Sequence, residues 1–208
     1  MKKDDINYGV YLVTDRSLLK GKDLGMAVEE SIQGGAGIIQ LREKNVSSLE
    51  FYNIAKDIKK ITDKYNVPLI INDRIDIALA VKASGVHLGQ EDIPCSLARE
   101  ILGKDMIIGV SAHNLDEALK AEKDGADYIG CGAVFSTNTK NDTTNIKISD
   151  IKKIKDNINI KVVAIGGINE NNIVELQGTG IDGVAVVSAV LGKDDIKKAT
   201  EELLKLDL

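Results

Sequence analysis

Short apolar runs rich in Val and Ile alternate with longer amphipathic segments from residue 8 onward. Parallel strands that are buried on both faces form such continuous apolar runs, whereas the helices that cover them keep one polar face. The pattern therefore predicts strands and helices in alternation. Eight runs qualify as strands, at residues 9–14, 37–41, 69–72, 85–88, 106–111, 128–132, 161–165 and 183–187.

The segments between these runs have the periodicity of helices. In residues 49–64, Phe51, Ile54, Ala55 and Ile58 recur at spacings of three and four. Several helices lead into the next strand through a similar phrase, namely GGAGIIQL, ASGVHLG, DGADYIG and GTGIDGV. Each phrase is typical of a helix that ends at Gly and is followed by a buried strand.

This regular repeat favours an α/β fold with a single (β/α)₈ TIM barrel over residues 1–208. The length of 208 residues is near the short end for that barrel, and no linker or low-complexity tract suggests a domain boundary. A doubly wound open sheet is the structural alternative. It would usually have fewer strands and one dominant Gly-rich loop after the first strand, which this sequence lacks.

Composition narrows the class of protein further. With 43% hydrophobic residues, 28% charged residues and 2 prolines, disordered and fibrous classes have no support. The net charge of −5 argues against a nucleic-acid partner, and no apolar stretch near the amino terminus is long enough to enter a membrane. Cys95 and Cys131 lack metal-binding spacing and are too few for a disulfide framework. We therefore expect a cytoplasmic protein.

Polar motifs follow the predicted strands at the positions where a TIM barrel builds its active site, the carboxyl ends of the strands. A long polar loop, residues 132–145, follows the sixth strand and could fold over a ligand. The motifs at the other strand ends are QLREK at 40–44, NDR at 72–74, HLGQED at 87–92, GVSAH at 109–113, AIGG at 164–167 and VVSA at 186–189.

Two anion sites are expected among these motifs. Arg42, Lys44 and Lys140 form one cluster of cations. The second site lies at the Gly166–Gly167 pair and at the helix start near Ser188, where backbone N–H groups and a helix end of about +0.5 charge suit a phosphate.

Asp73 and Asp92 follow neighbouring strands beside the cationic cluster. Carboxylates are out of place in an anion site unless a cation offsets them, and Mg²⁺ held by carboxylates and phosphate oxygens would do so. This combination suggests a diphosphate ligand. The alternative is that both aspartates belong to helix starts, with Asp73 as a cap and Asp92 placed before Pro94.

The other polar side chains at the strand ends suggest no acid/base or covalent catalysis. His87 and His113 are interpreted as hydrogen-bonded structural residues without a proton-transfer role. Ser111 lacks a nucleophile signature, and its hydroxyl fits a phosphate contact better. Arg74 and Glu91 are interpreted as solvated charges.

Seven motifs in order, QLREK, NDRIDIA, HLGQED, GVSAH, VFSTNTK, AIGGI and VVSAV, resemble those of the thiamine-phosphate synthase family. The resemblance runs over almost the whole chain, from YLVTD to VVSAV. It implies a TIM-barrel enzyme of thiamine biosynthesis, a transferase of the alkyl- or aryl-transferring type. Its substrates would be a hydroxymethylpyrimidine diphosphate and a thiazole phosphate, and its products thiamine phosphate and pyrophosphate.

The resemblance also implies roles for individual residues. Arg42, Lys44, Ser111 and Lys140 would be catalytic, and Asp73 and Asp92 would hold Mg²⁺. The substrate-binding residues would be Gln40, Leu41, Arg42, Glu43, Lys44, Asn72, Ser111, Thr137, Asn138, Thr139, Lys140, Gly166, Gly167, Val187 and Ser188.

The implied chemistry needs no protein nucleophile, because an aminopyrimidine can stabilise a cation at its methylene group when diphosphate departs. The thiazole nitrogen would then attack that cation. One departure from the family pattern is Ser136, where the family usually has Pro. Serine leaves φ freer, so this part of the loop would be more mobile before ligand binds.

Three other functions remain open at this stage. A thiazole tautomerase would use acid/base catalysis without the metal and diphosphate set. A phosphosugar isomerase or epimerase would share the second phosphate site but would need a general-base pair. A non-catalytic phosphate-binding protein would bind without turnover. A homo-oligomer is also compatible with the sequence.

Overall fold

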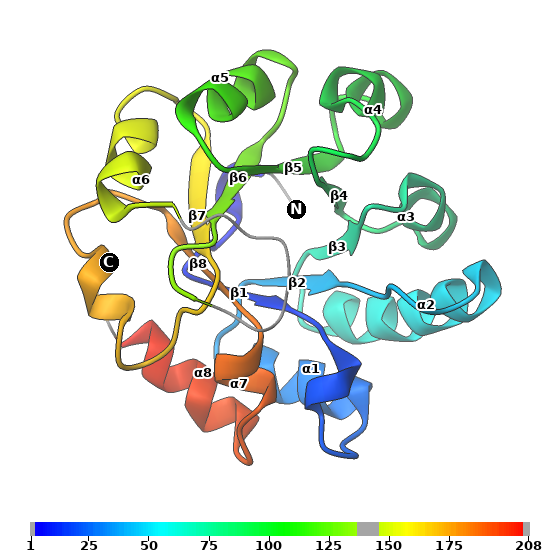
Figure 1. Ribbon diagram of the computed structural model, residues 1–208. Coiled ribbons are helices and arrows are strands. Elements are labelled where there is room, and N and C mark those ends of the chain that lie inside the picture. The colour runs from blue at the N-terminus through cyan, green and yellow to red at the C-terminus, as the bar shows by residue number, and fades with distance from the viewer. Residues whose placement is uncertain (1–2, 137–145, 206–208) are drawn as a thin grey trace.

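The computed structural model describes residues 3–136 and 146–205, and Figure 1 shows it along the barrel axis. Eight parallel strands close into a barrel in chain order, each paired with its two sequence neighbours and β1 paired with β8. This confirms the predicted (β/α)₈ class. The strands are β1 (Val10–Val13), β2 (Ile38–Leu41), β3 (Leu69–Asn72), β4 (Gly85–Leu88), β5 (Ile107–Ala112), β6 (Tyr128–Gly132), β7 (Lys161–Ile165) and β8 (Gly183–Val186).

Helices form an outer ring around the strands (Figure 1). The seventh crossover carries the short 3₁₀ helix η3 (Ile173–Leu176) in place of an α-helix, and two helices follow β8. No helix in the described ranges is both long and apolar enough to cross a membrane. The α-helices are α1 (Leu24–Gln33), α2 (Ser48–Lys64), α3 (Ile75–Val81), α4 (Cys95–Leu102), α5 (Leu115–Lys123), α6 (Ile148–Lys155), α7 (Ser188–Leu191) and α8 (Ile196–Leu204). Two further 3₁₀ helices are η1 (Lys3–Asp5) and η2 (Arg16–Leu18).

Four strands, β3, β4, β6 and β7, have the bounds that the apolar runs predict. The others differ by a residue or so at their ends, where polar and apolar positions do not mark the last ladder hydrogen bond. The helix α2 begins at Ser48, one residue earlier than predicted. Ser47 caps it by accepting a hydrogen bond from the Glu50 N–H at 3.2 Å.

The core has two layers because alternate side chains of each strand point outward and inward. Outward residues such as Leu12, Ile39 and Ile108 pack under the helices. Inward residues fill the barrel itself with Ile38, Ile70, Ile107, Val163 and Ala185, together with Tyr8, Tyr11 and Tyr128. Each fully buried large aliphatic side chain contributes roughly 1.5–3 kcal/mol of burial free energy. The tyrosines make this interior partly polar.

One backbone junction recurs at the foot of the barrel, before each even-numbered strand. There the residue ahead of the strand donates its N–H to a carbonyl of the preceding strand. The four pairs are Gly37 to Val10, Ser84 to Leu69, Asp127 to Ile108 and Asp182 to Val162, at 2.8–2.9 Å. In the last three the side chain also accepts from an N–H of that preceding strand. The repeated phrases of the sequence are therefore the sites of this junction.

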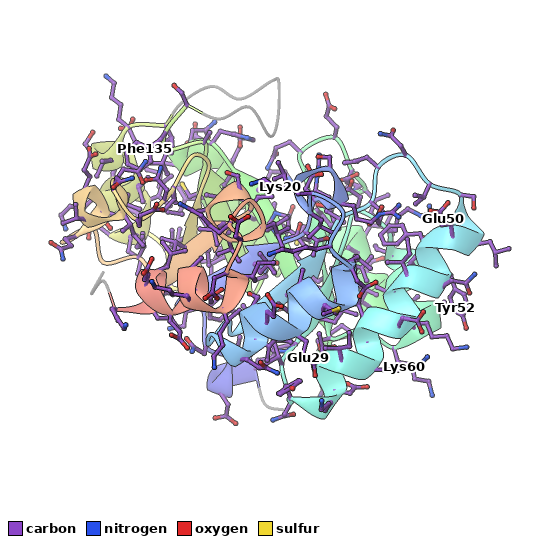
Figure 2. All side chains as sticks on the ribbon, turned by 90° about the horizontal axis from the view of Figure 1, so that it is seen from below. Lys20, Glu29, Glu50, Tyr52, Lys60 and Phe135 are labelled. Carbon is purple, nitrogen blue, oxygen red and sulfur yellow. The ribbon has the colours of Figure 1, made fainter. Side chains whose placement is uncertain are left out.

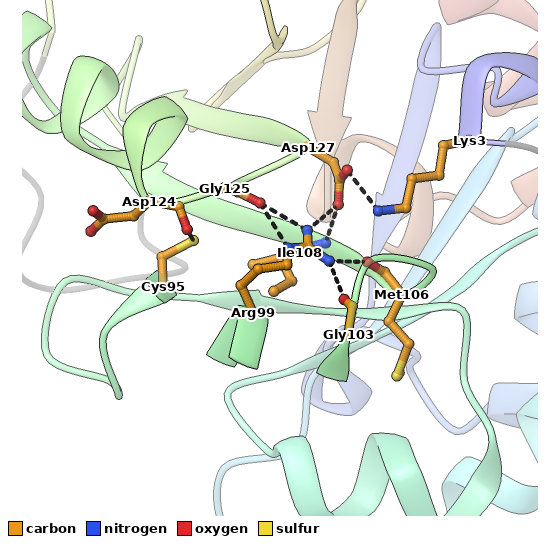
Figure 3. A network of polar contacts seen from close by, with 9 residues as sticks. All are labelled: Lys3, Cys95, Arg99, Gly103, Met106, Ile108, Asp124, Gly125 and Asp127. Atoms are coloured by element: carbon orange, nitrogen blue, oxygen red, sulfur yellow. Dashed lines mark hydrogen bonds and ion pairs between the residues drawn. The ribbon is translucent and has the colours of Figure 1, made fainter. Parts of the chain in front are cut away.

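Figure 3 shows the most connected of these junctions, around Asp127. Asp127 accepts from Arg99 at 2.7 Å and from Lys3 of η1 at 2.8 Å. Arg99 also donates to the carbonyls of Gly103, Met106 and Gly125. This network ties η1, α4, β5 and β6 together on the rim opposite the active site.

Candidate active site

A cavity of about 540 Å³ opens at the carboxyl ends of the strands. Figure 2 shows the molecule from the side, with Lys20, Glu50 and Phe135 towards this rim and Glu29 and Lys60 towards the foot. Most of the predicted site residues line the cavity. They are Gln40, Arg42, Lys44, Asn72, Asp73, Asp92, Ser111, Gly166, Gly167, Val187 and Ser188.

Two predicted residues, Leu41 and Glu43, do not line the cavity, and four others lie outside the described residues. Leu41 is fully buried in the outer core layer because it alternates with Gln40 and Arg42 on its strand. The Glu43 side chain is buried and pairs with Arg16 at 2.9 Å. Thr137, Asn138, Thr139 and Lys140 lie outside the described residues.

The cationic side of the cavity is built on the end of β2. Arg42 donates its backbone N–H to the buried Thr14 hydroxyl at 3.0 Å, which fixes the chain where it leaves the strand. Its guanidinium lies 3.9 Å from Asp15. Lys44 extends further and lies 2.5 Å from Asp73. Two cations on either side of Glu43 thus line the cavity, and both are groups that bind phosphate well.

The two aspartates form the acidic part of the same mouth. Asp73 has a left-handed backbone, with φ of 62°, and donates its N–H to the His87 carbonyl at 2.8 Å. Asp92 accepts from the Gly89 N–H at 2.6 Å. Burial and the neighbouring Asp73 carboxylate raise the pKa of Asp92 above its ordinary value. The two carboxylates therefore lie close enough to repel each other.

Neither aspartate caps a helix. The cap positions of α3 and α4 are Arg74 and Pro94, and neither makes a side-chain cap hydrogen bond. The capping interpretation of Asp73 is therefore wrong, whereas Asp92 does precede Pro94 at the start of α4, as that interpretation expects, without capping the helix.

The opposite side of the cavity is lined by backbone. Gly166 and Gly167 have φ of 102° and 67°, values that favour glycine. A Cβ on Gly167 would lie 2.7 Å from the Ser136 carbonyl oxygen and 2.8 Å from that of Phe135. The neighbouring helix α7 begins at Ser188, where first-turn N–H groups lack intrahelical partners. This side can therefore hold an anion with neutral donors.

A hydrogen-bonded chain inside the barrel reaches the cavity at both ends, and motif analysis did not find it. Gln40 Nε2 donates to the Tyr11 hydroxyl at 2.7 Å, and the hydroxyls of Tyr11 and Tyr128 lie 2.7 Å apart. His87 then joins Tyr128 to Ser111, with 3.0 Å from each ring nitrogen to its hydroxyl. Burial raises the pKa of both tyrosines well above the ordinary value, so their hydroxyls stay protonated.

A second polar pair in the cavity also escaped the sequence analysis. His113 Nδ1 lies 2.9 Å from Glu117, which also accepts from the His113 N–H at 2.8 Å. Burial would raise the pKa of Glu117, but these hydrogen bonds outweigh burial and lower it. The spacing of four residues across a strand end and a helix start gave no recognisable motif.

Fold and cavity together define a TIM-barrel enzyme with its active site at the carboxyl rim of the strands. Residues 10–190 match the family model described as thiamine monophosphate synthase. The chain belongs to the thiamine-phosphate synthase family, whose members are alkyl-transferring transferases of thiamine biosynthesis.

Individual relatives agree with this assignment. The chain is 60% identical to the thiamine-phosphate synthase of Clostridium tetani, over 98% of this chain and 97% of that protein. It is 55% identical to that of Clostridium botulinum strain Eklund 17B, over 97% and 94%. Among solved structures, thiamine phosphate pyrophosphorylase from Pyrococcus furiosus superposes with a TM-score of 0.89 at 46% identity, covering 97% and 96%.

Proposed function

We propose that the cavity joins hydroxymethylpyrimidine diphosphate to thiazole phosphate, releasing pyrophosphate. The observation that carries this proposal is the arrangement of charge around one cavity. Arg42, Lys44, Asp73 and Asp92 lie at one side, and the neutral backbone donors of Gly166 and Gly167 lie at the other. A diphosphate with a metal suits the first side and a monophosphate suits the second.

The pyrimidine would bind between the charged mouth and the barrel interior. Its diphosphate would contact Arg42 and Lys44, and its ring would contact Asn72, Gln40 and Ser111. Lys140 would add a third cation from the loop after β6. These contacts would hold the methylene carbon at a fixed place above the strand ends.

The thiazole phosphate would occupy the second side, with its phosphate at Gly167, Val187 and Ser188. Thr137, Asn138 and Thr139 would complete this subsite, with Gly166 alongside. The two substrates would thus meet in the cavity with the thiazole nitrogen facing the pyrimidine methylene. Holding both in this geometry supplies much of the rate enhancement of a two-substrate reaction.

Asp73 and Asp92 fit a Mg²⁺ site, because two mutually repelling carboxylates are stabilised by a divalent cation. In the described part of the chain no group of three or more His, Cys, Asp or Glu side chains is assembled to hold a metal. The remaining ligands would therefore be diphosphate oxygens and water, as is usual for Mg²⁺. When bound, Mg²⁺ would neutralise charge on the leaving diphosphate.

The residues of this chain would then act by position and charge. Arg42, Lys44 and Lys140 would stabilise the charge that develops on the departing diphosphate. Departure would leave a pyrimidine cation stabilised by its own amino group, and the thiazole nitrogen would attack it. Val163, Ile165 and Ala185 line the cavity with apolar surface that would keep water away. The buried free thiols of Cys95 and Cys131 agree with a reaction in the cytoplasm.

The test is pyrophosphate release by the purified protein given both substrates and Mg²⁺, and given each substrate alone. Release should require both substrates, and Asp73→Ala should reduce it by about 100-fold or more. Asp76→Ala is the matched control, because Asp76 is an exposed carboxylate paired with Arg74 on the same loop and helix. It should leave the rate unchanged.

Other outcomes would separate the alternatives. Binding of both substrates without pyrophosphate would indicate a binding protein. Interconversion of the tautomers of thiazole carboxylate phosphate, without pyrophosphate release, would indicate the tautomerase, with the His113 and Glu117 pair as its acid/base group. In that case His113→Asn should abolish the interconversion.

A further inference from the structure

We propose that Tyr11, Tyr128 and His87 are positioning residues that force Gln40 and Ser111 to present opposite hydrogen-bonding groups, one donor and one acceptor, to the pyrimidine. The inference rests on the proposed function, in which Gln40 and Ser111 both contact that ring. It extends the site into the barrel interior. It also assigns ligand selection to side chains that would otherwise count as core.

The chain is continuous and runs from wall to wall of the cavity. Its four links measure 2.7 Å from Gln40 to Tyr11, 2.7 Å from Tyr11 to Tyr128, 3.0 Å from Tyr128 to His87 and 3.0 Å from His87 to Ser111. Both tyrosines are at most 1% exposed. A buried hydroxyl that loses its partner costs about 1–3 kcal/mol, so the links are strongly favoured to form together.

Each internal member of the chain gives one hydrogen and takes one. A tyrosine hydroxyl donates once, and a neutral imidazole has one donor nitrogen and one acceptor nitrogen. Hydrogen bonds can therefore be donated along the chain in only two self-consistent directions, which we call its two senses. In the first, Gln40 donates to Tyr11, and the series continues through Tyr128 and His87 until Ser111 accepts. In the second, every link is reversed.

The two senses have the same consequence at the cavity. In the first sense one hydrogen of the Gln40 amide nitrogen is used inside, so its oxygen is the acceptor left for a ligand beside the second hydrogen, while the Ser111 hydroxyl can donate. In the second sense Ser111 donates inward and presents lone pairs, while Gln40 presents its NH₂ group. An intact chain thus always leaves an acceptor at one end and a donor at the other.

The ligand edge that suits this arrangement carries one donor beside one acceptor. A 4-aminopyrimidine has such an edge, because its amino group donates and the adjacent ring nitrogen accepts. A 4-methoxypyrimidine has two adjacent acceptors and would leave one of them facing another acceptor. The chain should therefore discriminate between the two rings even where both fit the cavity.

The surrounding backbone is shaped to hold these side chains. A Cβ on Gly109 would lie 2.0 Å from Tyr128 Cζ, and a Cβ on Gly130 would lie 3.1 Å from His87 Cε1. The rings of Tyr128 and His87 also pack together, with centroids 5.5 Å apart. Glycines thus open the space in which the two middle links lie.

The experiment measures the Kd of 4-amino-5-hydroxymethyl-2-methylpyrimidine diphosphate and of its 4-methoxy counterpart, with Mg²⁺ and without thiazole. Tyr128→Phe removes both middle links, to Tyr11 and to His87, and keeps the ring. The two halves can then turn independently, so Gln40 and Ser111 can both donate. The ratio of the two Kd values should therefore move about tenfold towards the methoxy compound, which corresponds to one recovered contact of about 1.4 kcal/mol.

Tyr8→Phe is the matched control. Tyr8 is a neighbouring tyrosine inside the barrel, with its ring centroid 5.5 Å from that of Tyr128, and it forms none of the four links. It should keep the wild-type ratio. Tyr11→Phe removes the links of Tyr11 to Gln40 and to Tyr128, and it should reproduce the shift of Tyr128→Phe. Thermal unfolding checks that each variant is folded.

The results distinguish this inference from the proposed function. If Tyr128→Phe and Tyr11→Phe weaken both compounds equally, the tyrosines only pack and the inference is overturned. If the wild-type protein binds the aminopyrimidine diphosphate and releases pyrophosphate but the ratio never moves, the inference fails alone. If the wild-type protein binds neither pyrimidine, the proposed function fails first.

Discussion

Lys44 and Asp73 form an ion pair at the mouth of the cavity, with 2.5 Å between the ammonium nitrogen and a carboxylate oxygen. The carboxylate is one of the two proposed for Mg²⁺. In the free protein the lysine therefore competes with a divalent cation for Asp73. A bound diphosphate would give Lys44 a different anion to contact and would leave Asp73 to the metal.

Lys44→Met should consequently have two opposite effects. Without diphosphate, Mn²⁺ should bind several-fold more tightly, because a competing positive charge has gone. Catalysis should fall by about 100-fold or more in kcat/KM, because a cation that stabilises the leaving group is lost. Mn²⁺ titration calorimetry and pyrophosphate release measure the two effects. Lys20→Met, on the same rim but paired with the exposed Asp194, should change neither; weaker Mn²⁺ binding by Lys44→Met would contradict the competition.

Gly167→Ala should affect the thiazole side selectively. The residue has φ of 67°, and its Cβ would approach the carbonyl oxygens of Phe135 and Ser136 to 2.8 Å and 2.7 Å. Left-handed backbone alone costs a residue with a Cβ roughly 1–2 kcal/mol. The KM for thiazole phosphate should rise at least tenfold, while the Kd of the pyrimidine diphosphate stays within about twofold. Gly178→Ala, at φ of 75° with open space around its Cβ, controls for backbone strain alone.

Asp127→Ala should destabilise the fold without entering the active site. Asp127 accepts from Lys3, Arg99 and the Ile108 N–H, so its loss leaves a partly buried guanidinium without its carboxylate. The expected cost is about 2–3 kcal/mol in the free energy of unfolding, below the value for a fully buried pair. Urea unfolding measures it. Asp156→Ala, in an exposed pair with Lys152, should cost under about 0.5 kcal/mol.

The hydrogen bonds of Asp182 should make the stability of the fold decrease in acid. Burial would raise its pKa, but hydrogen bonds from Lys155, Lys161 and the Val162 N–H outweigh burial and hold the pKa below 3.8. A lowered carboxyl pKa stabilises the fold above about pH 4, and this contribution is lost as the pH falls through the lower folded value. The stability difference between the wild type and Asp182→Asn should therefore shrink between about pH 5 and pH 3. A difference that stays constant over this range in urea unfolding would contradict the assignment.

Much of the fold follows from local pattern. Strands such as β3 and β6 are buried along their whole length, so their bounds follow the apolar runs closely. The secondary structure of the segments between strands is predicted less well. Residues 173–176 form only a 3₁₀ helix, and the chain that follows is interrupted by Gly178 and Gly180, both at positive φ.

The sequence predicts the candidate site residues that stand at strand ends. It does not predict those that lie inside the barrel. Arg42, Asp73 and Gly166 stand directly after strands, so their convergence follows from topology. Tyr11 and Tyr128 are 117 residues apart and meet across the barrel, and no local pattern encodes that contact. Leu41 shows the opposite error, because a contiguous motif was taken as one surface although alternate residues of a strand point to opposite sides.

The junction that recurs before β2, β4, β6 and β8 divides the barrel into four two-stranded modules, each closed at its foot by its own hydrogen bonds. A cut in the loop between β4 and β5 would leave two fragments that each keep two complete modules. Such half-barrels, mixed in solution, are the natural choice for fragment complementation. Recovery of pyrophosphate release on mixing would then report reassembly of the rim from halves whose own junctions are already formed, with contacts such as Lys3 to Asp127 left to be rebuilt at the foot.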